Sequence, residues 1–592
     1  MDPAPALVEG QGLRIAVEGC GHGTLDAIYA AVQKACEVRG WDGVDLLIIG
    51  GDFQAVRNAS DLTVMSCPVK YREIGDFHKY YSGTAKAPYL TIFIGGNHEA
   101  SSHLWEIFYG GWVAPNIYYM GAANVVRVGG VRIAGMSGIW KGRDYNKHHH
   151  ERLPYNQDDV KTIYHVREID IRKLLQLKSQ VDICISHDWP RAIENHGDSR
   201  ALFRWKPDFE QESKEGTLGN QAATYVMDRL RPPYWFAAHM HCKFAAAKSY
   251  EDTTEDNAAS LPSSVEADHH HPPAKTAEDP VIAAAAHNAD EIDLDMDDEE
   301  TLPPPKLAPT NGSVSTSTTT NQYELDMDGD KKLPEVSAAA TIPSSVPSDL
   351  RAQLPAAFSA PSAQSSRQVP GQPKPREVTN KTVRFLALDK CLPSRKFLQL
   401  LEVHPHAKTN HEFPASQSIP RPKPKFEYDP EWLAITRVFA PSIVLGNKQA
   451  LPAKDLGEAN YRPLIEKEQD WVNEHIVKTD KLEIPENFVI TAPIFHVGMP
   501  EIVNEGPVEY SNPQMQQYCQ LVGIENKFFA TQEWRDERMS LGPAPEEERR
   551  DGGFGRGRGR GGRGGRGGRG GGGRGGGRGQ GRGGGRGRGR GW

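Results

Sequence analysis

Five short polar motifs occur in order through the first half of the chain, each directly after an apolar run. The motifs combine glycine with cysteine, histidine, aspartate and asparagine, whose side chains bind divalent metals. Strand ends that meet at one edge of a sheet are rigid supports for such ligands, so the series predicts a two-metal phosphoesterase centre. The motifs are Gly19-Cys20-Gly21-His22, Gly50-Gly51-Asp52, Gly95-Gly96-Asn97-His98-Glu99, Ser186-His187-Asp188 and His239-Met240-His241.

One aspartate is expected to bridge the two metals. Hydrolysis of a phosphodiester needs an activated water and charge neutralisation on phosphate, and two metals about 3.5 to 4 Å apart meet both needs. Asp52 is the candidate bridge because it lies in a Gly-Gly-Asp context at a strand end, while Asn97 adds a neutral oxygen that limits the negative charge. We expect one metal to be held by Cys20, His22, Asp52 and His241, and the other by Asp52, Asn97, His187 and His239.

His98 is the candidate catalytic residue. It follows Asn97 directly, so its side chain is expected to point away from the metals. Imidazole titrates near neutrality and can protonate a departing 2′ or 3′ oxygen or donate to a phosphate oxygen. Glu99 and Asp188 are expected to orient the rings of His98 and His187, respectively, through hydrogen bonds that the carboxylates accept.

The apolar runs before the motifs alternate with helical patterns. Residues 13–17 read as a strand and residues 25–38 as a helix, and Gly129-Gly130 sits in a hairpin signal. Further strands are expected at 44–49, 89–94, 183–185 and 234–236. This alternation predicts an α/β catalytic domain over residues 13–249.

The composition changes after the first domain. Residues 250–375 are rich in Ala, Ser, Thr, Pro and Asp, and are predicted to be a disordered acidic linker because they cannot bury enough apolar area. The acidic pieces at 291–300 and 324–328 are open to two interpretations, a docking motif for a basic partner or a solvated spacer. An alternating strand pattern at 382–390 begins a second, smaller α/β domain expected over residues 376–545.

Residues 546–592 are predicted to be a disordered tail, because from Gly552 onward the chain consists almost entirely of Gly and Arg. The 592-residue chain has a net charge of −8, and removing the twelve arginines of residues 556–592 leaves −20 on the rest. We therefore expect the tail to be attracted to nucleic acid and the body not to be.

The seven cysteines are irregularly spaced, which favours a reducing compartment over a secreted disulfide scaffold. No basic and apolar leader pattern is present at the start, and no run approaches the roughly 20 apolar residues of a membrane span. A soluble, intracellular protein without membrane contact is expected, and its oligomeric state is left open.

The ordered motifs resemble the calcineurin-like metallophosphoesterase superfamily, whose fold is a β-sandwich flanked by helices. Residues 53–58 differ from the second Asp and the Asp-Arg-Gly of its protein phosphatases, which argues against that class. Longer stretches resemble the RNA lariat debranching enzymes, and Cys20, in place of the usual carboxylate, is a mark of that family. These stretches are 50–58, 164–167, 186–190 and 217–219, with 385–393 similar to the start of the family's C-terminal domain.

The resemblance implies a nuclear enzyme that hydrolyses the 2′-5′ phosphodiester at the branch point of excised intron lariats, linearising them for turnover. It also implies a lariat-recognition loop at about 137–165, whose cations meet phosphates and whose rings stack on bases. For His148 to His150 the alternative is a solvated loop. The expected RNA-contacting residues are Trp140, Lys141, Arg143, Tyr145, His148 and Arg152.

The expected metals follow from the soft sulfur ligand. A thiolate at Cys20 favours Fe(II) or Zn(II) over Mg(II), with Mn(II) tolerated by the oxygen and imidazole donors, and the resemblance implies the same three metals. The tail resembles the RGG segments of RNA-binding proteins, which bind RNA without strict sequence choice. The alternative for the tail is a role in solubility or localisation.

Two other functions are weighed against debranching. A metallophosphoesterase acting on linear nucleic acid or small phosphodiesters is disfavoured by the recognition-loop and C-terminal resemblances. An inactive scaffold that only binds RNA or protein is disfavoured because every expected ligand position is filled.

Overall fold

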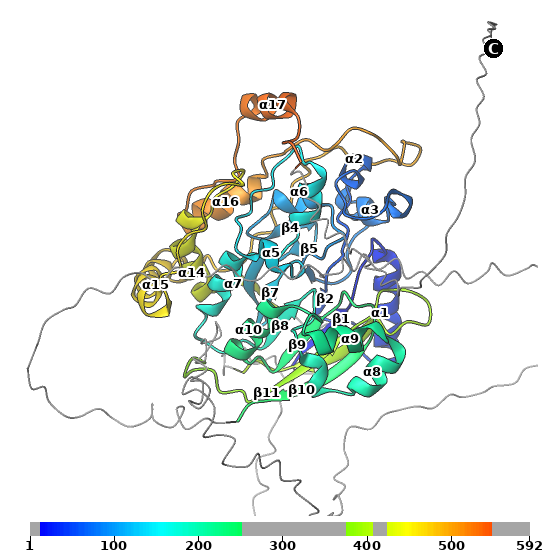
Figure 1. Ribbon diagram of the computed structural model, residues 1–592, viewed down its shortest axis with the longest axis vertical. Helices are drawn as coiled ribbons and strands as arrows, with labels where there is room; N and C mark the ends of the chain where they lie inside the picture. Colours follow the sequence, from blue (N-terminus) through cyan, green and yellow to red (C-terminus); the bar gives the residue numbers. More distant parts are fainter. Residues whose placement is uncertain (1–11, 252–373, 407–422, 547–592) are drawn as a thin grey trace, which may run out of the picture. The chain divides into compact units, whose positions relative to one another are not determined.

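The computed structural model describes residues 12–251, 374–406 and 423–546 (Figure 1). Nearly all of the predicted acidic linker and of the predicted Gly/Arg tail lies outside the described residues. The described part of the chain forms one compact unit.

Two mixed sheets make up the centre of this unit, and both contribute to one hydrophobic core. The first sheet has the strand order β12 (Leu398–Val403), β1 (Leu13–Glu18), β2 (Leu46–Ile49), β3 (Thr91–Phe93), β5 (Ile117–Tyr119) and β4 (Gly111–Ala114). The second has the order β10 (Phe244–Ser249), β11 (Thr382–Ala387), β9 (Tyr234–Ala237), β8 (Ile183–Ser186), β7 (Val131–Met136), β6 (Ala123–Val128) and β13 (Phe426–Tyr428).

Each sheet contains four adjacent strands that run parallel. In the first sheet β1, β2, β3 and β5 are parallel, and in the second β7, β8, β9 and β11 are. The sequence of β2 is Leu-Leu-Ile-Ile and all four residues are buried, as expected for a strand covered on both faces. The strands predicted before the five motifs are therefore present, with their carboxyl ends free to carry the polar residues.

Helices flank the sheets. The predicted helix at 25–38 is α1 (Leu25–Arg39), and it ends at Gly40, whose left-handed backbone (φ 71°) closes the last turn. The other helices of the first half are α2 (Ala59–Leu62), α3 (Phe77–Tyr81), α4 (Ser101–Trp105), α5 (Gly142–Tyr145), α6 (Gln157–Thr162), α7 (Glu168–Leu175), α8 (Ser199–Trp205), α9 (Asp208–Glu215) and α10 (Gln221–Leu230). Short 3₁₀ helices occupy Val69–Tyr71 and Ile193–His196.

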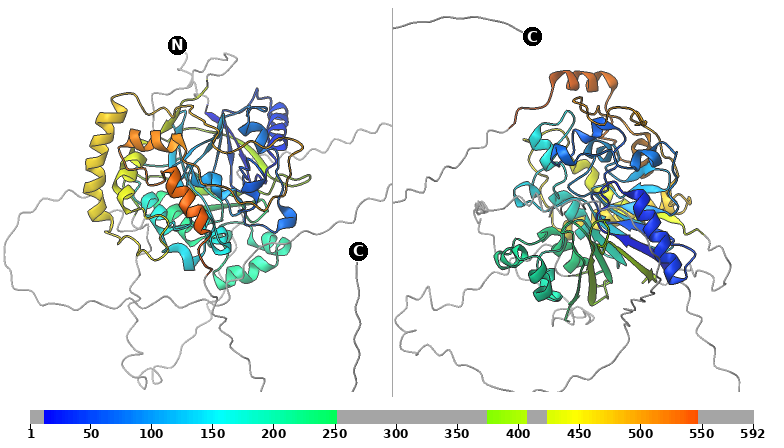
Figure 2. Two further views of the ribbon diagram at one scale, coloured as in Figure 1. Left: turned by 90° about the horizontal axis from the view of Figure 1, so that it is seen from above. Right: turned by 90° about the vertical axis from the view of Figure 1, so that its right-hand side faces the viewer.

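The second block supplies a further helical layer. In Figures 1 and 2, α14 and α15 pack against each other at one side of the molecule. Its helices are α14 (Pro430–Phe439), α15 (Glu458–Val472), α16 (Pro513–Val522) and α17 (Gln532–Leu541), with a 3₁₀ turn at Ala440–Ser442 and a π-helical turn at Asn473–Val477.

The predicted α/β fold class is confirmed, and the structure adds how the two blocks are joined. Strand β12 pairs with β1, β11 lies between β9 and β10, and β13 pairs with β6. The first strands of the second block thus complete the catalytic sheets, and the boundary expected at residue 376 does not separate two cores. Sequence pattern alone did not reveal this, because pairing partners more than a hundred residues apart leave no local signal.

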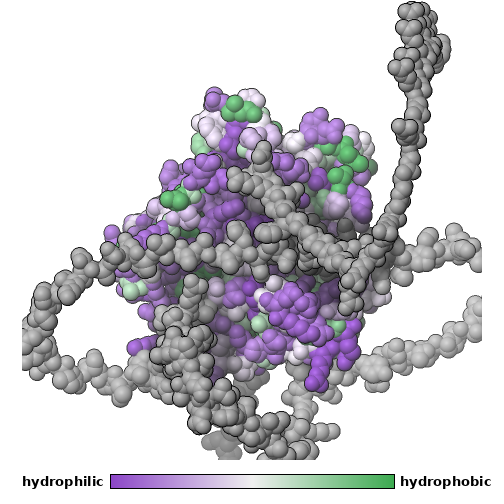
Figure 3. All heavy atoms as spheres, viewed as in Figure 1, coloured by the Kyte–Doolittle hydropathy of each residue, from purple (hydrophilic) through white to green (hydrophobic). Residues whose placement is uncertain are grey.

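The face seen in Figure 3 is mostly hydrophilic, with small apolar patches over α17 and beside α2. Among the described residues, no helix has the length and apolar character that a membrane span requires.

A buried carboxylate ties the second block to the second sheet. Asp429, fully buried, accepts hydrogen bonds at 2.8 Å from Arg127 Nε and from Arg132 Nε and a terminal nitrogen of Arg132. It also caps α14 by accepting from the Trp432 amide at 3.0 Å. Burial raises the pKa of Asp429, but Arg132 and Arg127 outweigh it and bring the pKa to about 2.

We expect Asp429→Asn to lower the free energy of unfolding by about 1.5 to 3 kcal/mol, because Arg127 loses its counter-charge and the buried Arg132 keeps only its ion pair with Glu431. Urea unfolding at neutral pH measures this, with Glu486→Gln as control, since its exposed pair with Lys423 contributes only about 0 to 1 kcal/mol. Because the folded pKa lies below the unfolded value of about 3.9, the wild type should lose this contribution as pH falls through that window. A variant as stable as the wild type would contradict this role.

Candidate metal centre

Five parallel strands from both sheets end beside one another, and each is followed by a predicted ligand. Strands β1, β2 and β3 lead to Cys20, Asp52 and Asn97, and strands β8 and β9 lead to His187 and His239. The two sheets meet here, since a side-chain carbon added at Gly50 would lie 3.0 Å from the Ala238 methyl group. The predicted ligands from Cys20 to His241 therefore lie at one edge of the sandwich.

The first predicted ligand set is brought together. One ligand atom from each of Cys20, His22, Asp52 and His241 lies within 4.8 Å of all the others. His22 Nε2 is 3.2 Å from His241 Nε2 and 3.7 Å from Asp52 Oδ2. This is the arrangement in which four donors surround one small cation.

The donor chemistry of this set fits a divalent cation. Two imidazole nitrogens 3.2 Å apart need a proton or a cation between their lone pairs. Burial lowers the pKa of His22 to about 4 and that of His241 to about 2, so both rings are neutral at neutral pH and each has a lone pair that a cation can take. Burial and Asp52 raise the pKa of the Cys20 thiol, so binding of a metal there must release its proton.

The second predicted set lies on the other side of the same aspartate. His187 Nε2 is 3.4 Å from Asp52 Oδ1 and 3.3 Å from Asn97 Oδ1. The rings of His187 and His239 are 5.0 Å apart, and burial lowers the pKa of His239 to about 3. Asp52 thus presents one oxygen to each set, as expected for a bridging ligand.

The backbone of the centre is strained in an unusual way. His22, Asp52, His239 and His241 all have left-handed φ values, between 42° and 59°. Such conformations cost of order 1 to 3 kcal/mol each and persist where the surroundings demand them, which is typical of functional sites. Gly96 makes room for the bridge, because a side-chain carbon there would lie 2.1 Å from Asp52 Oδ1.

His98 lies at the rim of the centre, as expected. Its backbone N–H donates to Asp52 Oδ1 at 2.8 Å, and its Nδ1 donates to the Ser66 carbonyl at 2.8 Å. Its ring is 6.0 Å from that of His22. With Nδ1 engaged, Nε2 is the nitrogen left to act on a substrate. The loop that carries Ser66 had no motif, so its role could not be found from the sequence.

The expected hydrogen bond between the His98 ring and the Glu99 carboxylate is not formed. The Glu99 carboxylate instead accepts from the backbone amides of Phe53 and Gln54 at 2.8 Å and of Gly96 at 2.9 Å. Burial and Asp52 raise the pKa of Glu99 to about 7. Glu99 therefore connects the turn after β2 to the turn after β3, which carry Asp52 and Asn97. Its side chain is buried, whereas that of His98 is partly exposed.

Asp188 also has partners other than those expected. It accepts from the Trp189 amide at 2.8 Å and from the Trp140 amide at 3.3 Å, while His187 Nδ1 donates to the Gly50 carbonyl at 2.9 Å. The backbone of the neighbouring strand end orients His187, and Asp188 anchors the start of the predicted recognition loop. The strand has ended at Ser186, and the bend at His187 and Asp188 gives the two neighbouring side chains different partners.

Four of the six predicted RNA-contacting residues lie at the surface of the loop. Trp140, Lys141 and Tyr145 are partly exposed and Arg143 is exposed. The rings of Trp140 and Tyr145 lie 4.9 Å apart, and the charge of Lys141 contributes, after burial, to the low pKa of His239. These residues therefore border the second ligand set.

His148 and Arg152, for which RNA contact is predicted, are both buried against the second block in this structure. His148 Nε2 donates to the Leu451 carbonyl at 2.6 Å, and Arg152 forms a two-point ion pair with Glu509 at 2.7 and 2.9 Å. The alternative of a solvated loop fails, since His148, His149 and His150 are all buried. A partner three hundred residues away cannot be inferred from the local sequence.

Lys390 and Glu18 are two neighbours of the centre that the motifs did not predict. Lys390 follows β11, and its backbone forms a β-bridge with that of Cys20. After burial, its charge contributes to the low pKa values of His22 and His241. Glu18 ends β1, and its buried carboxyl has no hydrogen-bond partner among the described residues. Its position directly before the Gly19-Cys20 motif is the signal that could have identified it.

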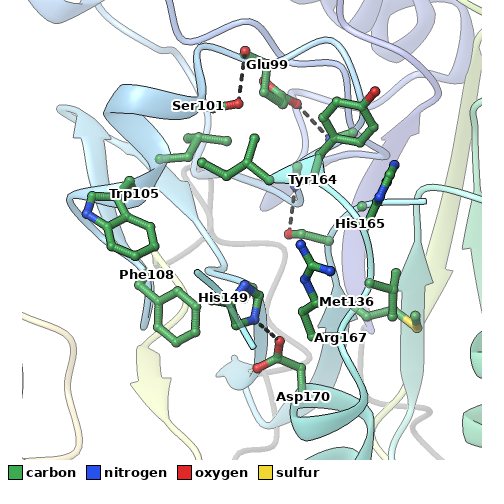
Figure 4. A pocket seen from close by; sticks show the side chains of 18 of the residues that line it. Glu99, Ser101, Trp105, Phe108, Met136, His149, Tyr164, His165, Arg167 and Asp170 are labelled. Carbon is green, nitrogen blue, oxygen red and sulfur yellow. Dashed lines mark hydrogen bonds and ion pairs between the residues drawn. The ribbon is translucent and has the colours of Figure 1, made fainter. Parts of the chain in front are cut away.

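A cavity of about 80 Å³ lies behind the centre (Figure 4). Figure 4 shows Glu99 at one end, the His149–Asp170 pair at the other, and Trp105 and Phe108 on one wall. None of the predicted metal ligands lines it. The cavity is therefore distinct from the metal-binding edge, although Glu99, which bonds to the ligand-bearing turns, lines it.

The chain is similar to known phosphoesterases along most of its length. Residues 13–243 match the family "Calcineurin-like phosphoesterase", and residues 380–527 match "Lariat debranching enzyme, C-terminal domain". The chain is 40% identical over 517 residues to the lariat debranching enzyme of Schizosaccharomyces pombe, covering 87% of this chain and 96% of that protein. It is 34% identical to the lariat debranching enzyme of Homo sapiens over 538 residues, 90% of this chain and 74% of that protein. Identity to the lariat debranching enzyme of Arabidopsis thaliana is 53% over 235 residues, 40% and 56% of the two chains.

Replacing the sulfur ligand tests the first ligand set. We expect Cys20→Ser to lower the bound metal from about two ions to about one per chain, because a hydroxyl is a poor ligand for soft cations. Elemental analysis after dialysis measures the metal content, and Cys36→Ser on α1 is the matched control. Unchanged metal content together with an unchanged rate would remove Cys20 from the ligand set.

Proposed function

The chain belongs to the lariat debranching enzyme family, and on that premise we propose that it hydrolyses the 2′-5′ phosphodiester at the branch point of excised intron RNA. The observation that carries the proposal is the gathering of Cys20, His22, Asp52 and His241 within 4.8 Å at the edge of a calcineurin-like fold. Its product is a linear RNA, ready for turnover in mRNA processing.

Two divalent cations, when bound, supply positive charge to the phosphate oxygens and activate a water. The chain's own residues set the conditions for that chemistry. Asp52 presents its two oxygens to the two ligand sets, and the neutral amide of Asn97 keeps the negative charge low enough for an anionic substrate. Burial lowers the pKa values of His22, His239 and His241, which favours their neutral, metal-binding form.

His98 is the proposed general acid. Its Nδ1 hydrogen bond to the Ser66 carbonyl holds the ring in place, so that Nε2 carries the proton to the departing 2′ oxygen. The backbone bond from His98 to Asp52 ties the acid to the bridging ligand and keeps the two at a constant separation. Trp140, Lys141, Arg143 and Tyr145 are the proposed contacts for bases and phosphates at the branch.

We propose Fe(II), Zn(II) or Mn(II) as the metals. The support is the donor set, one sulfur with several imidazoles and a carboxylate, which suits these ions better than Mg(II). The same sulfur makes the centre sensitive to oxidation.

The remaining proposals concern the cell and the tail. Residence in the nucleus follows from the substrate, because introns are excised there. The Gly/Arg tail is proposed to add RNA contacts that are independent of sequence, through arginine on phosphate and base faces.

The substrate preference separates debranching from its alternatives. We expect the metal-loaded protein to cleave a branched RNA with a 2′-5′ linkage and to leave a linear RNA of the same sequence intact. The assay compares both RNAs with added Mn(II), Fe(II) or Zn(II), and with chelator as the control. Equal cleavage of the linear RNA would favour a general phosphodiesterase, and no cleavage of either would favour a binding scaffold.

His98→Ala is expected to lower the turnover of branched RNA by about 10² to 10⁴-fold, because the leaving oxygen loses its proton donor. Metal content and RNA affinity should stay within about threefold, since the side chain is not assigned to either ligand set. Single-turnover rates, elemental analysis and a filter-binding assay measure the three quantities. His475→Ala, an exposed histidine on the π-helical turn, is the control. Loss of binding in parallel with loss of rate would make His98 a structural residue.

A further inference from the structure

The metal centre has cations beside both of its ligand sets. Lys141 of the predicted recognition loop lies near His239, in the second set. Lys390 lies beside the first set, because its backbone forms a β-bridge with that of Cys20. Strands β10 and β11 are antiparallel neighbours with Phe244 opposite Ala387, and the charge of Lys390 acts on His241, which lies three residues before Phe244. The predicted recognition loop contains Lys141 but not Lys390, so it supplies a cation to only one of the two ligand sets.

Lys390 begins a turn that carries further exposed cations. The turn connects β11 to β12 and includes Arg395 and Lys396, both exposed. Its one acid, Asp389, is buried and lies 3.6 Å from Arg395, and its amide donates to the Lys396 carbonyl at 3.2 Å. The exposed side of the turn is therefore positively charged although the body of the chain is acidic.

Two cations from the first block extend this surface. Lys243, exposed at the start of β10, donates to Gln399 at 3.2 Å, and burial together with the charge of Lys396 lowers its pKa. Lys206 follows α8, and its charge acts on Asp389 and on Cys242, the residue after His241. The five cations Lys206, Lys243, Lys390, Arg395 and Lys396 are called the β11-turn surface below.

Apolar side chains lie beside these cations. Trp205, next to Lys206 at the end of α8, is 50% exposed, and Leu392 in the turn is 41% exposed. The surface over α8 and α9 in Figure 3 is strongly hydrophilic. Cations next to an exposed ring are typical of surfaces that bind single-stranded nucleic acid, where phosphates meet cations and bases stack.

We propose that the β11-turn surface binds the phosphates of one RNA arm that leaves the metal centre, while the recognition loop holds another. Three strands diverge at a branch point, so a single flank cannot hold the junction in one orientation. Cations next to each ligand set would place the scissile phosphate over the centre from both directions. This inference rests on the proposed function and gives the second block a direct part in choosing a branched substrate.

The test removes charge at a distance from the ligands. The triple variant Lys243→Gln, Arg395→Gln, Lys396→Gln leaves Lys390 and the metal ligands in place. It is compared with the wild type on branched RNAs whose arms are about ten nucleotides or one nucleotide long, each arm being extended separately. The matched control is Lys34→Gln, Lys478→Gln, Lys481→Gln, which removes three exposed lysines from α1 and from the region of the π-helical turn.

We expect the wild type to cleave one of the long-armed substrates faster than the short-armed one at low salt, and the triple variant to lose that advantage about fivefold or more. The slope of log kcat/KM against log salt on that substrate should become shallower by about two, since each single-strand phosphate contact contributes about 0.7. The arm whose advantage disappears identifies the strand that the surface binds. Metal content and melting temperature should match those of the wild type.

Two outcomes would overturn the inference while leaving debranching intact. The triple variant could keep both the long-arm advantage and the salt slope, in which case the surface does not bind RNA. It could also lose activity equally on short and long arms, in which case the residues act at the reaction centre. Failure of the proposed function is a different result, because the wild type itself would then not distinguish branched from linear RNA.

Discussion

The buried carboxylate of Asp52 is the group on which the rest of the centre depends. It is 1% exposed and faces three imidazoles and a backbone amide, so that burial raises its pKa but His187, His98 and His22 bring it well below the usual value. An ionised carboxylate at such depth is tolerated only where positive charge and hydrogen bonds compensate it. The left-handed turns bring the ligand residues close to this buried negative charge. Gly96 leaves room for the carboxylate, because it has no side chain there.

The second block completes this environment. Strand β11 fills a place between β9 and β10, so its end arrives next to the ends of β1 and β9 and delivers Lys390 to the first ligand set. Asp429, between β13 and α14 of the block, accepts hydrogen bonds from Arg127 and Arg132 of the second sheet and so fixes both elements to that sheet. The ligand-bearing strands all come from the first 251 residues, but the two sheets are complete only with β11, β12 and β13 of the second block.

The residues behind the ligands act through the backbone. Glu99 gathers three amides from two ligand-bearing turns, and the Gly50 carbonyl orients His187. Backbone groups at strand ends have unpaired donors and acceptors, so they are the nearest partners for a buried side chain. This explains why the side-chain pairs expected between sequence neighbours were replaced by contacts between a side chain and a strand end.

The sequence by itself determined which residues meet at the centre. Each ligand motif follows an apolar run that predicts a buried strand, and the ends of parallel strands lie at a common edge of a sheet. It also determined the fold class and the helix α1, whose apolar spacing and terminal Gly40 are local signals. Only the tertiary structure decided the partners of Glu99, Asp188, His148 and Arg152, and the place of Lys390 beside the ligands. Those contacts join segments up to several hundred residues apart, and the geometry that selects them exists only once the two sheets have packed together.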